Sequence, residues 1–308
     1  MRQPGQPVSS SSAAENHSVS AERQSPGSQT KGHDRESPPP PPRRDATLLS
    51  LERGSALVIA CDSCGGVGEK PGDAVQVPPE ITGYYTCRVA ALEVLSMGAC
   101  ILSVIDTLSV EWEPTGRRIL AGIRKFLAEA GLAESIAVNG STEENFAMTQ
   151  TAMGITVIGQ APAGKLITAA AQPGDLLVAA GLPKVGHEIR HPLDPEVVSL
   201  DDFMTIRQQE GVHDMIPVGS KGIRYEGELL GALSGLQVRW REQPDQGGGR
   251  MQIRGDLSQG VTVTVDLSKS GGPATCVLAA MTRKAFEELA GRVKAPFHIL
   301  GSLYPRTG

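Results

Sequence analysis

The sequence predicts an α/β (α+β) protein in which mixed sheets pack with helices. Its 308 residues suffice for about two domains. In the first half, strand-like apolar runs alternate with helical patterns. A segment rich in proline and glycine, residues 160–174, interrupts this alternation before apolar runs resume. We therefore expect a tail over residues 1–44, a first domain over 45–165 and a second over 166–308.

Residues 1–44 have the composition of a disordered segment. They contain nine serines, two valines, no aromatic residue and the proline run from Pro38 to Pro42. Such a chain cannot bury enough apolar surface to offset its conformational entropy. We expect it to contribute nothing to a core.

Apolar spacing places strands and helices in the first domain. Strands are expected at residues 56–60, 101–106, 135–138 and 154–158, and helices at 81–97 and 115–130. The second helix has one apolar face and ends at Gly131. The first is apolar nearly all round, as a buried helix is, except at Glu93. A buried carboxylate there needs a base such as Arg88, a proton or a metal ion.

The second domain has further strands and two helices. Strands are expected at residues 175–181, 236–240, 251–254, 261–265 and 297–300, and residues 215–222 read as a strand entering a glycine-rich loop. Ser199 caps one expected helix, with Asp202 at the capping-box position. Another covers residues 283–290, and the glycines at 247–249 predict a flexible surface loop.

The stretch after the first strand has the chemistry of a nucleotide site. Its glycines let backbone N–H groups converge on an anion, Asp62 at the strand end suits Mg²⁺, and Lys70 suits phosphate oxygens. Pro71 excludes both a Walker A loop and a dinucleotide-binding loop. A nucleotide-binding loop and an ordinary turn therefore both stay open. The glycines are Gly65, Gly66 and Gly68.

A second polar segment follows the strand expected at 135–138. Acids and hydroxyls at a strand end can contact a metal ion or phosphate. An ordinary Asn-Gly turn with solvent-facing acids explains the same residues. The segment comprises Asn139, Gly140, Ser141, Thr142, Glu143, Glu144 and Asn145.

Composition excludes several classes of protein. The net charge is −5, and acids outnumber bases outside the tail, so a nucleic-acid partner is not expected. No apolar run approaches the ~18 residues of a membrane span, and no secretory signal is present. Five cysteines, an odd number, suggest reduced thiols, and we expect a cytoplasmic protein.

Two motifs are set aside. The segment from His187 to His191 matches H-E-x-x-H, but Gly186 and Pro192 flank it, so we expect a surface loop instead of a zinc-binding helix. Cys61 and Cys64 have C-x-x-C spacing without a second pair nearby; a redox role stays open, although the glycine-rich continuation does not resemble a thioredoxin helix, and small buried thiols are the commoner case.

Asp62, the glycines and Lys70 resemble the Asp-Gly-x-Gly-x-Lys segment of aminoimidazole ribonucleotide synthetase and its relatives. These relatives include thiamine monophosphate kinase, selenophosphate synthetase and a hydrogenase maturation protein. The order of features agrees over residues 52–305: the loop, a helix with Glu93 ahead of a Gly-Ala end, an amphipathic helix, and a strand ending in Gly-x-Thr.

One branch of this superfamily, α-ribazole kinase, is similar in several further blocks. It phosphorylates the 5′-hydroxyl of α-ribazole during salvage of the cobalamin lower ligand. The similar blocks are Val77-Pro78, Tyr84-Tyr85, Arg88-Val89-Ala90, residues 140–146, residues 215–222 and residues 272–276.

The resemblance implies a two-domain fold like that of aminoimidazole ribonucleotide synthetase, with ATP in the cleft between domains, Mg²⁺ as cofactor, a nucleoside as substrate and a homodimer joined through its N-terminal sheets. It implies that Asp62 and Glu93 bind the metal and that Lys70 contacts phosphate. Ser141 stands where many relatives have an acid, so Glu143 or Glu144 would substitute as ligand. Contacts to the nucleotide are implied for Gly65, Gly66, Gly68, Lys70, Ser141, Thr142 and Asn145, and a wall for the substrate base for Tyr84 and Tyr85.

Two other functions stay open. One is another ATP-dependent reaction of the superfamily, such as that of thiamine monophosphate kinase or selenophosphate synthetase. The other is a non-catalytic nucleotide-binding regulator.

Overall fold

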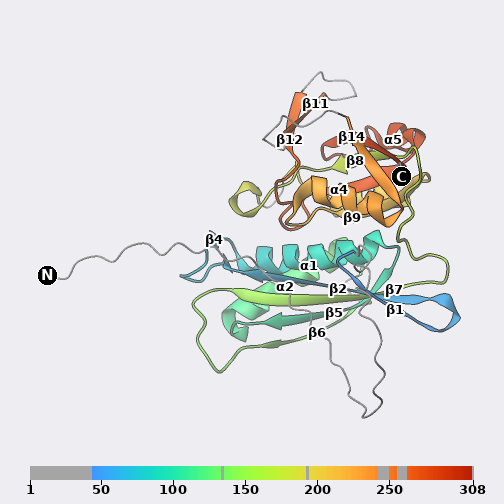
Figure 1. Cartoon of the computed structure of the whole chain (residues 1–308). Coiled ribbons are helices and arrows are strands. Elements are labelled where there is room, and N and C mark those ends of the chain that lie inside the picture. Colours follow the sequence, from blue (N-terminus) through green and yellow to red (C-terminus); the bar gives the residue numbers. More distant parts are fainter. Residues whose placement is uncertain (1–43, 133–134, 192–193, 242–249, 255–261, 307–308) are drawn as a thin grey trace, which may run out of the picture. The chain divides into compact units, whose positions relative to one another are not determined.

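The computed structural model describes residues 44–132, 135–191, 194–241, 250–254 and 262–306 (Figure 1). The tail over residues 1–43 and the glycines at 247–249 lie outside the described residues. Arg44, which the sequence analysis assigned to the tail, is only 8% exposed. Its guanidinium donates hydrogen bonds to Asp214 (2.8 Å) and to the Ser96 hydroxyl (2.9 Å). Arg44 therefore belongs to the folded part of the chain, and the tail boundary at 44 is wrong for this residue.

Five strands form the first sheet (Figure 1). Their order is β1-β2-β7-β5-β6, in which β5 and β6 are parallel and the other neighbours antiparallel. The sheet is therefore mixed, as expected. The strands are β1 (Thr47–Ser50), β2 (Ala56–Gly65), β5 (Cys100–Leu108), β6 (Ala137–Thr142) and β7 (Ala152–Ala161), with the short parallel pair β3 (Val67–Gly68) and β4 (Val75–Gln76) beside them.

Two helices pack together beside this sheet. They are α1 (Pro79–Ser96) and α2 (Arg117–Glu129), close to the predicted ranges. The two helices approach so closely that glycine is required at two contact points. A Cβ at Gly83 would collide with the Ile119 carbonyl, and one at Gly122 would collide with the Glu80 carbonyl. Gly131 follows α2 with φ +71°, which suits a glycine C-cap.

Five antiparallel strands form the second sheet, in the order β10-β14-β8-β13-β9. The Ser199 hydroxyl accepts a hydrogen bond from the Asp202 N–H and so caps α3, as predicted. The elements are β8 (Leu176–Ala180), α3 (Leu200–Gln208), β9 (Val212–Pro217), α4 (Gly222–Leu233), β10 (Leu236–Trp240), β13 (Val277–Met281), α5 (Arg283–Leu289) and β14 (Phe297–Pro305), with the hairpin β11 (Arg250–Arg254) and β12 (Thr262–Asp266).

Apart from the two-residue strands β3 and β4 and short helical turns, three elements were not predicted. β1 is a four-residue edge strand, too short for a periodic signal. β13 is buried at every position, so it shows no alternation. α4 contains three glycines, Gly222, Gly227 and Gly231, which weaken a helical pattern.

One hydrophobic cluster joins the helix-covered face of the first sheet to one face of the second. Arg88 on α1 crosses it: the side chain is 1% exposed and donates hydrogen bonds to the carbonyls of Val198 and Ala274 (3.1 Å to Ala274). The change of sheet falls between Ala161 and Leu176. A domain boundary at residue 165 stays a prediction. No helix among the described residues is both long and apolar enough to cross a membrane.

Candidate functional site

Asp62 lies within β2, not after its end. The strand continues to Gly65, so the predicted strand end at residue 60 is wrong. Asp62 is opposite Ile155 of β7, and Ile155 is opposite Asp106 of β5. The two aspartates therefore share one face of the sheet, roughly 10 Å apart at two strand spacings.

Asp62 lines a cleft of about 340 Å³. β2, the first half of α1 and the loops around residues 185–191 and 272–273 form its walls. The walls are mainly apolar, with Tyr85 and His191 in edge-to-face contact at 5.4 Å between ring centroids. Burial raises the pKa of Asp62 to about 6, and a hydrogen bond from the Ser63 backbone opposes this. The cleft thus combines apolar walls with one desolvated carboxylate, as ligand sites commonly do.

The glycine-rich loop is held by internal contacts. The N–H groups of Gly66 and Gly72 donate to the carbonyls of Thr151 and Thr149, and that of Lys70 donates to the Asp73 carboxylate. Asp73 also accepts hydrogen bonds from the Thr151 N–H (2.7 Å) and hydroxyl (2.8 Å). These amides already have partners, so the expected convergence of the loop N–H groups on an anion is not formed in this conformation.

Lys70 lies beside Glu111, with 2.7 Å between the ammonium and Oε2. The Lys70 side chain is 15% exposed, so this ion pair is partly shielded from water. Glu111 also accepts a hydrogen bond from the Thr115 hydroxyl. Lys70 therefore needs to exchange Glu111 for a phosphate before it can act as predicted.

The second polar segment is not an Asn-Gly turn, because β6 runs through it to Thr142. Glu144 accepts hydrogen bonds from the Trp112 N–H (2.8 Å) and the Thr142 hydroxyl (2.9 Å). Glu143 accepts one from the Asn145 N–H (2.7 Å). Ser141 alternates with Thr142 and faces the other side of the sheet. The two glutamates thus stabilise the conformation of the segment that follows β6 by accepting these hydrogen bonds.

Glu93 lies apart from these groups. Its Oε2 atom is buried without a hydrogen-bond partner. Burial raises the pKa of Glu93 to about 8, opposed by the positive charge of Arg44 and reinforced by nearby acids, of which Asp62 has the smallest effect. Arg88 is not its partner, because that guanidinium donates to backbone carbonyls. Of the options expected for Glu93, the protonated state fits this structure.

Replacing Glu93 with glutamine should flatten the pH dependence of stability. The folded-state pKa of about 8 exceeds the usual glutamate pKa of 4.5, so the unfolded chain loses this proton first and the free energy of unfolding falls as pH rises through that window. We expect Glu93→Gln to recover roughly 1–3 kcal/mol at pH 8 relative to pH 5. Urea unfolding at pH 5 and pH 8 measures this difference in the free energy of unfolding. Burial raises the pKa of Glu226 to about 7, so the variant still keeps the pH dependence of stability that comes from Glu226. Equal pH slopes would contradict this assignment.

The described residues contain no group of three histidine, cysteine, aspartate or glutamate side chains placed to hold a metal ion. Asp62, Glu93, Glu143 and Glu144 are thus not gathered in one site. Asp62 fits Mg²⁺ on its own, since this ion is commonly held by one or two carboxylates with water and substrate phosphates.

The two motifs set aside resolve differently. Residues 186–188 form one turn of 3-10 helix and Ile189 is extended, so H-E-x-x-H does not lie on the α-helix that a zinc site of this kind needs, as predicted. Cys61 is exposed and Cys64 is half-buried, so the expectation of buried thiols is wrong for Cys61, which points to the uncovered face of β2.

Sequence reasoning did not find the roles of Asp73 and Asp106. Asp73 closes the loop through contacts 78 residues away, which no local pattern signals. The sequence analysis placed Asp106 in a buried strand. An acidic residue inside a buried strand is itself a sign of a functional or ligand-binding role, and it could have singled out Asp106.

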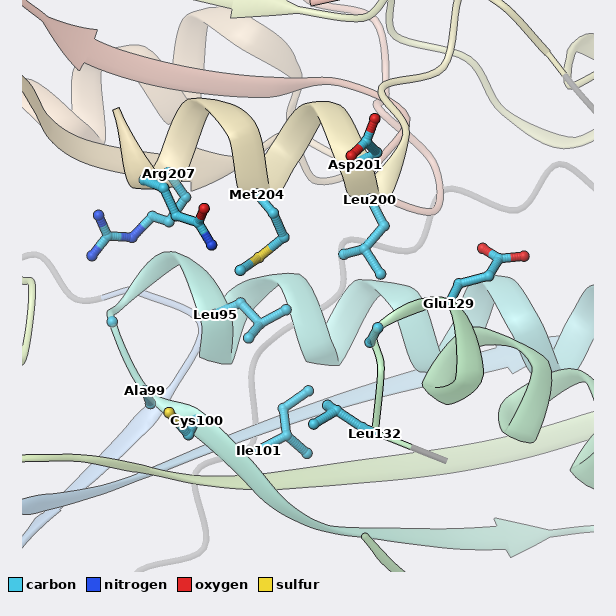
Figure 2. A pocket seen from close by; sticks show the side chains of 13 residues that line it. Leu95, Ala99, Cys100, Ile101, Glu129, Leu132, Leu200, Asp201, Met204 and Arg207 are labelled. Atoms are coloured by element: carbon cyan, nitrogen blue, oxygen red, sulfur yellow. The ribbon is translucent and has the colours of Figure 1, made fainter. Parts of the chain in front are cut away.

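A larger cavity of about 580 Å³ lies elsewhere and contains none of the predicted site residues. Figure 2 shows Leu95, Leu200 and Met204 facing one another across it, with Arg207 toward one end and Glu129 and Asp201 toward the other. The cleft at Asp62 is smaller, but two of the predicted site residues, Asp62 and Gly65, line it.

Solved structures resemble this chain over most of its length. Thiamine monophosphate kinase from Aquifex aeolicus has a TM-score of 0.56 at 13% identity, over 84% of this chain and 88% of that one. Escherichia coli HypE, a hydrogenase maturation protein, has a TM-score of 0.52 at 14% identity, over 82% and 80%. PurL from T. maritima, complexed with ADP, has a TM-score of 0.55 at 12% identity, over 86% of this chain and 42% of that one.

The chain shares its fold with these proteins. The expected two-domain fold of the aminoimidazole ribonucleotide synthetase type is therefore confirmed. No family model and no curated protein matches the sequence.

Proposed function

We propose that this protein is an ATP-dependent phosphotransferase that acts on a small molecule. The observation that carries the proposal is Asp62, a desolvated carboxylate in an apolar cleft on a fold shared with thiamine monophosphate kinase. AaThiL, a solved structure with this fold, was complexed with AMPPCP and TMP, and PurL was complexed with ADP. These complexes support a nucleotide as ligand of this chain.

Asp62 in the cleft and Lys70, which does not line it in this conformation, would work by positioning and by charge neutralisation. Asp62 would hold Mg²⁺, which neutralises the charge of the phosphates, and Lys70 would leave Glu111 for a phosphate oxygen. The apolar walls, including Tyr85, would exclude water from the transfer. Tyr84 is a weaker candidate for this wall, because its hydroxyl donates to Glu129 (2.6 Å) and its ring packs on Phe126.

Two acceptors follow from different observations. The shared fold favours thiamine monophosphate as the acceptor, in a reaction like that of thiamine monophosphate kinase. The sequence blocks favour the 5′-hydroxyl of α-ribazole as the acceptor. The apolar wall formed with Val67, Val75 and Ile81 suits the planar base of either substrate.

Incubation with ATP, Mg²⁺ and each acceptor in turn, followed by mass detection of the phosphorylated product, tests the proposal. We expect one acceptor to gain a phosphoryl group with stoichiometric ADP. Saturable ATP binding without ADP release across both acceptors and further nucleosides would favour the regulator instead.

We also propose that two copies pair through the first sheet. Leu49, Leu57, Ile59 and Ile158 share the face opposite α1, because they are paired in register across β1, β2 and β7. Leu49 is 48% exposed, and the helices α1 and α2 join the core on the other face. An apolar sheet face of this kind commonly marks an interface.

A charge in this face should separate the dimer. We expect Ile158→Glu to sediment as a monomer and the native chain as a dimer, because the interface would bury an unpaired carboxylate. Analytical ultracentrifugation measures this. Tyr225→Glu, at an exposed position of α4, is the matched control and should stay dimeric. A monomeric native chain would contradict the proposal.

A further inference from the structure

A separate cavity of about 250 Å³ lies between β5, β6 and α2, with Asp106 on its wall. Asp106 is 5% exposed. Within the described part of the chain, its carboxylate accepts no hydrogen bond and forms no ion pair, and burial raises its pKa to about 6. The carboxylate is partly desolvated and lines the cavity, so a ligand of opposite charge could pair with it there.

The carboxylate has room because residue 140 is glycine. A Cβ at Gly140 would overlap Asp106 Oδ1, which shows that the carboxylate rests against the backbone of β6. Leu108, Trp112, Leu120 and Val138 supply the apolar and aromatic part of the wall, and Asn139, Ser141 and Thr142 supply a polar part. This cavity and the cleft of Asp62 have no lining residue in common.

The chain near the cavity is acidic. Glu144 accepts hydrogen bonds from Trp112 and Thr142, two residues of the cavity wall, and Glu143 precedes it. Two bases of neighbouring segments are paired with acids: Lys70 with Glu111, and Arg117 with Glu113 at 3.0 Å. The local field therefore favours a positive ligand.

The donor set indicates an organic cation over a metal ion. A divalent cation needs several oxygen ligands, and among the described residues no three acids, histidines or cysteines are placed to hold one. One carboxylate beside an indole suits an ammonium group, which pairs with the acid and is attracted to the aromatic face. The volume is below the roughly 300–1,000 Å³ of sites for drug-sized ligands, so a small ligand is indicated.

We propose that the cavity at Asp106 binds a small organic cation that carries its N–H⁺ group on an apolar body. The charged end pairs with Asp106, and the apolar body contacts Leu108, Leu120 and Trp112. Asp62 and Lys70, which carry the proposed phosphoryl transfer, do not line this cavity, whereas Ser141 and Thr142 do.

Tryptophan fluorescence tests the site directly. The chain has two tryptophans, Trp112 and Trp240, so Trp240→Phe leaves Trp112 as the sole reporter. This variant is titrated at constant ionic strength with n-butylammonium and benzylammonium chloride, and with n-butanol and benzyl alcohol as neutral matches. We expect the ammonium ions to saturate the site with dissociation constants on the order of 1 mM, and the alcohols to bind at least about tenfold more weakly.

Asp106→Asn in the same background should abolish the preference for the ammonium ions. The matched control Glu113→Gln alters an acid next to Trp112 that is already paired with Arg117, and it should keep the preference. Leu120→Phe, which narrows the cavity without touching the acid, should weaken both ammonium ions and supplies the test if the Asn variant fails to fold. Absence of a saturable Trp112 response, or an undiminished preference in Asp106→Asn, would overturn the proposal.

Discussion

Asp62→Asn should reduce phosphoryl transfer on the order of 10³-fold and leave the fold intact. The amide keeps the shape of the side chain but removes the charge that would hold Mg²⁺ against the phosphates. Because burial already disfavours the ionised form of Asp62, the variant should be at least as stable as the native chain. Initial rates at saturating ATP and acceptor, together with thermal unfolding, measure both effects.

Asp201→Asn is the matched control for this substitution. Its carboxylate is 77% exposed at the start of α3, where it faces Lys294 at 3.4 Å. It should leave the rate unchanged, because it lies outside the cleft. A native rate in Asp62→Asn, with the control also native, would remove Asp62 from the site.

Lys70→Met should lower the rate about 100-fold, because the transferring phosphoryl group would lose a positive charge. The same change leaves Glu111 without its base, so a fall in stability on the order of 1 kcal/mol accompanies it. Steady-state kinetics with ATP as the varied substrate measures the loss.

Glu111→Gln separates the two roles of Lys70. If the Glu111 pair only restrains Lys70, its removal frees the ammonium and should lower the KM for ATP. If Lys70 is purely structural, both Lys70→Met and Glu111→Gln would reduce stability without changing the rate per folded molecule, and that result would contradict the phosphate role.

Most of the fold could be predicted because its elements carry local signals. The spacing of apolar residues predicts the buried character of α1 and the single apolar face of α2, and the N-cap residue Ser199 predicts the start of α3. β13 was not predicted, because a strand buried at every position shows no apolar-polar alternation. α4 was not predicted, because its glycines weaken the helical pattern.

The candidate site was less readable because it depends on register. Asp62 was recognised as chemically important, but its place inside β2 follows from pairing with β7, which local sequence does not specify. Glu93 was recognised as an anomaly, but the positive charge that lowers its pKa belongs to Arg44, a residue that composition assigned to the tail. Long-range contacts decide both cases.

The most direct test of the central claim is a crystal structure of the protein with AMPPCP and Mg²⁺. We predict the triphosphate in the cleft lined by Tyr85 and His191, with an Asp62 oxygen about 2.1 Å from the metal ion. A nucleotide bound at another site, with the Asp62 carboxylate free of metal, would contradict the account.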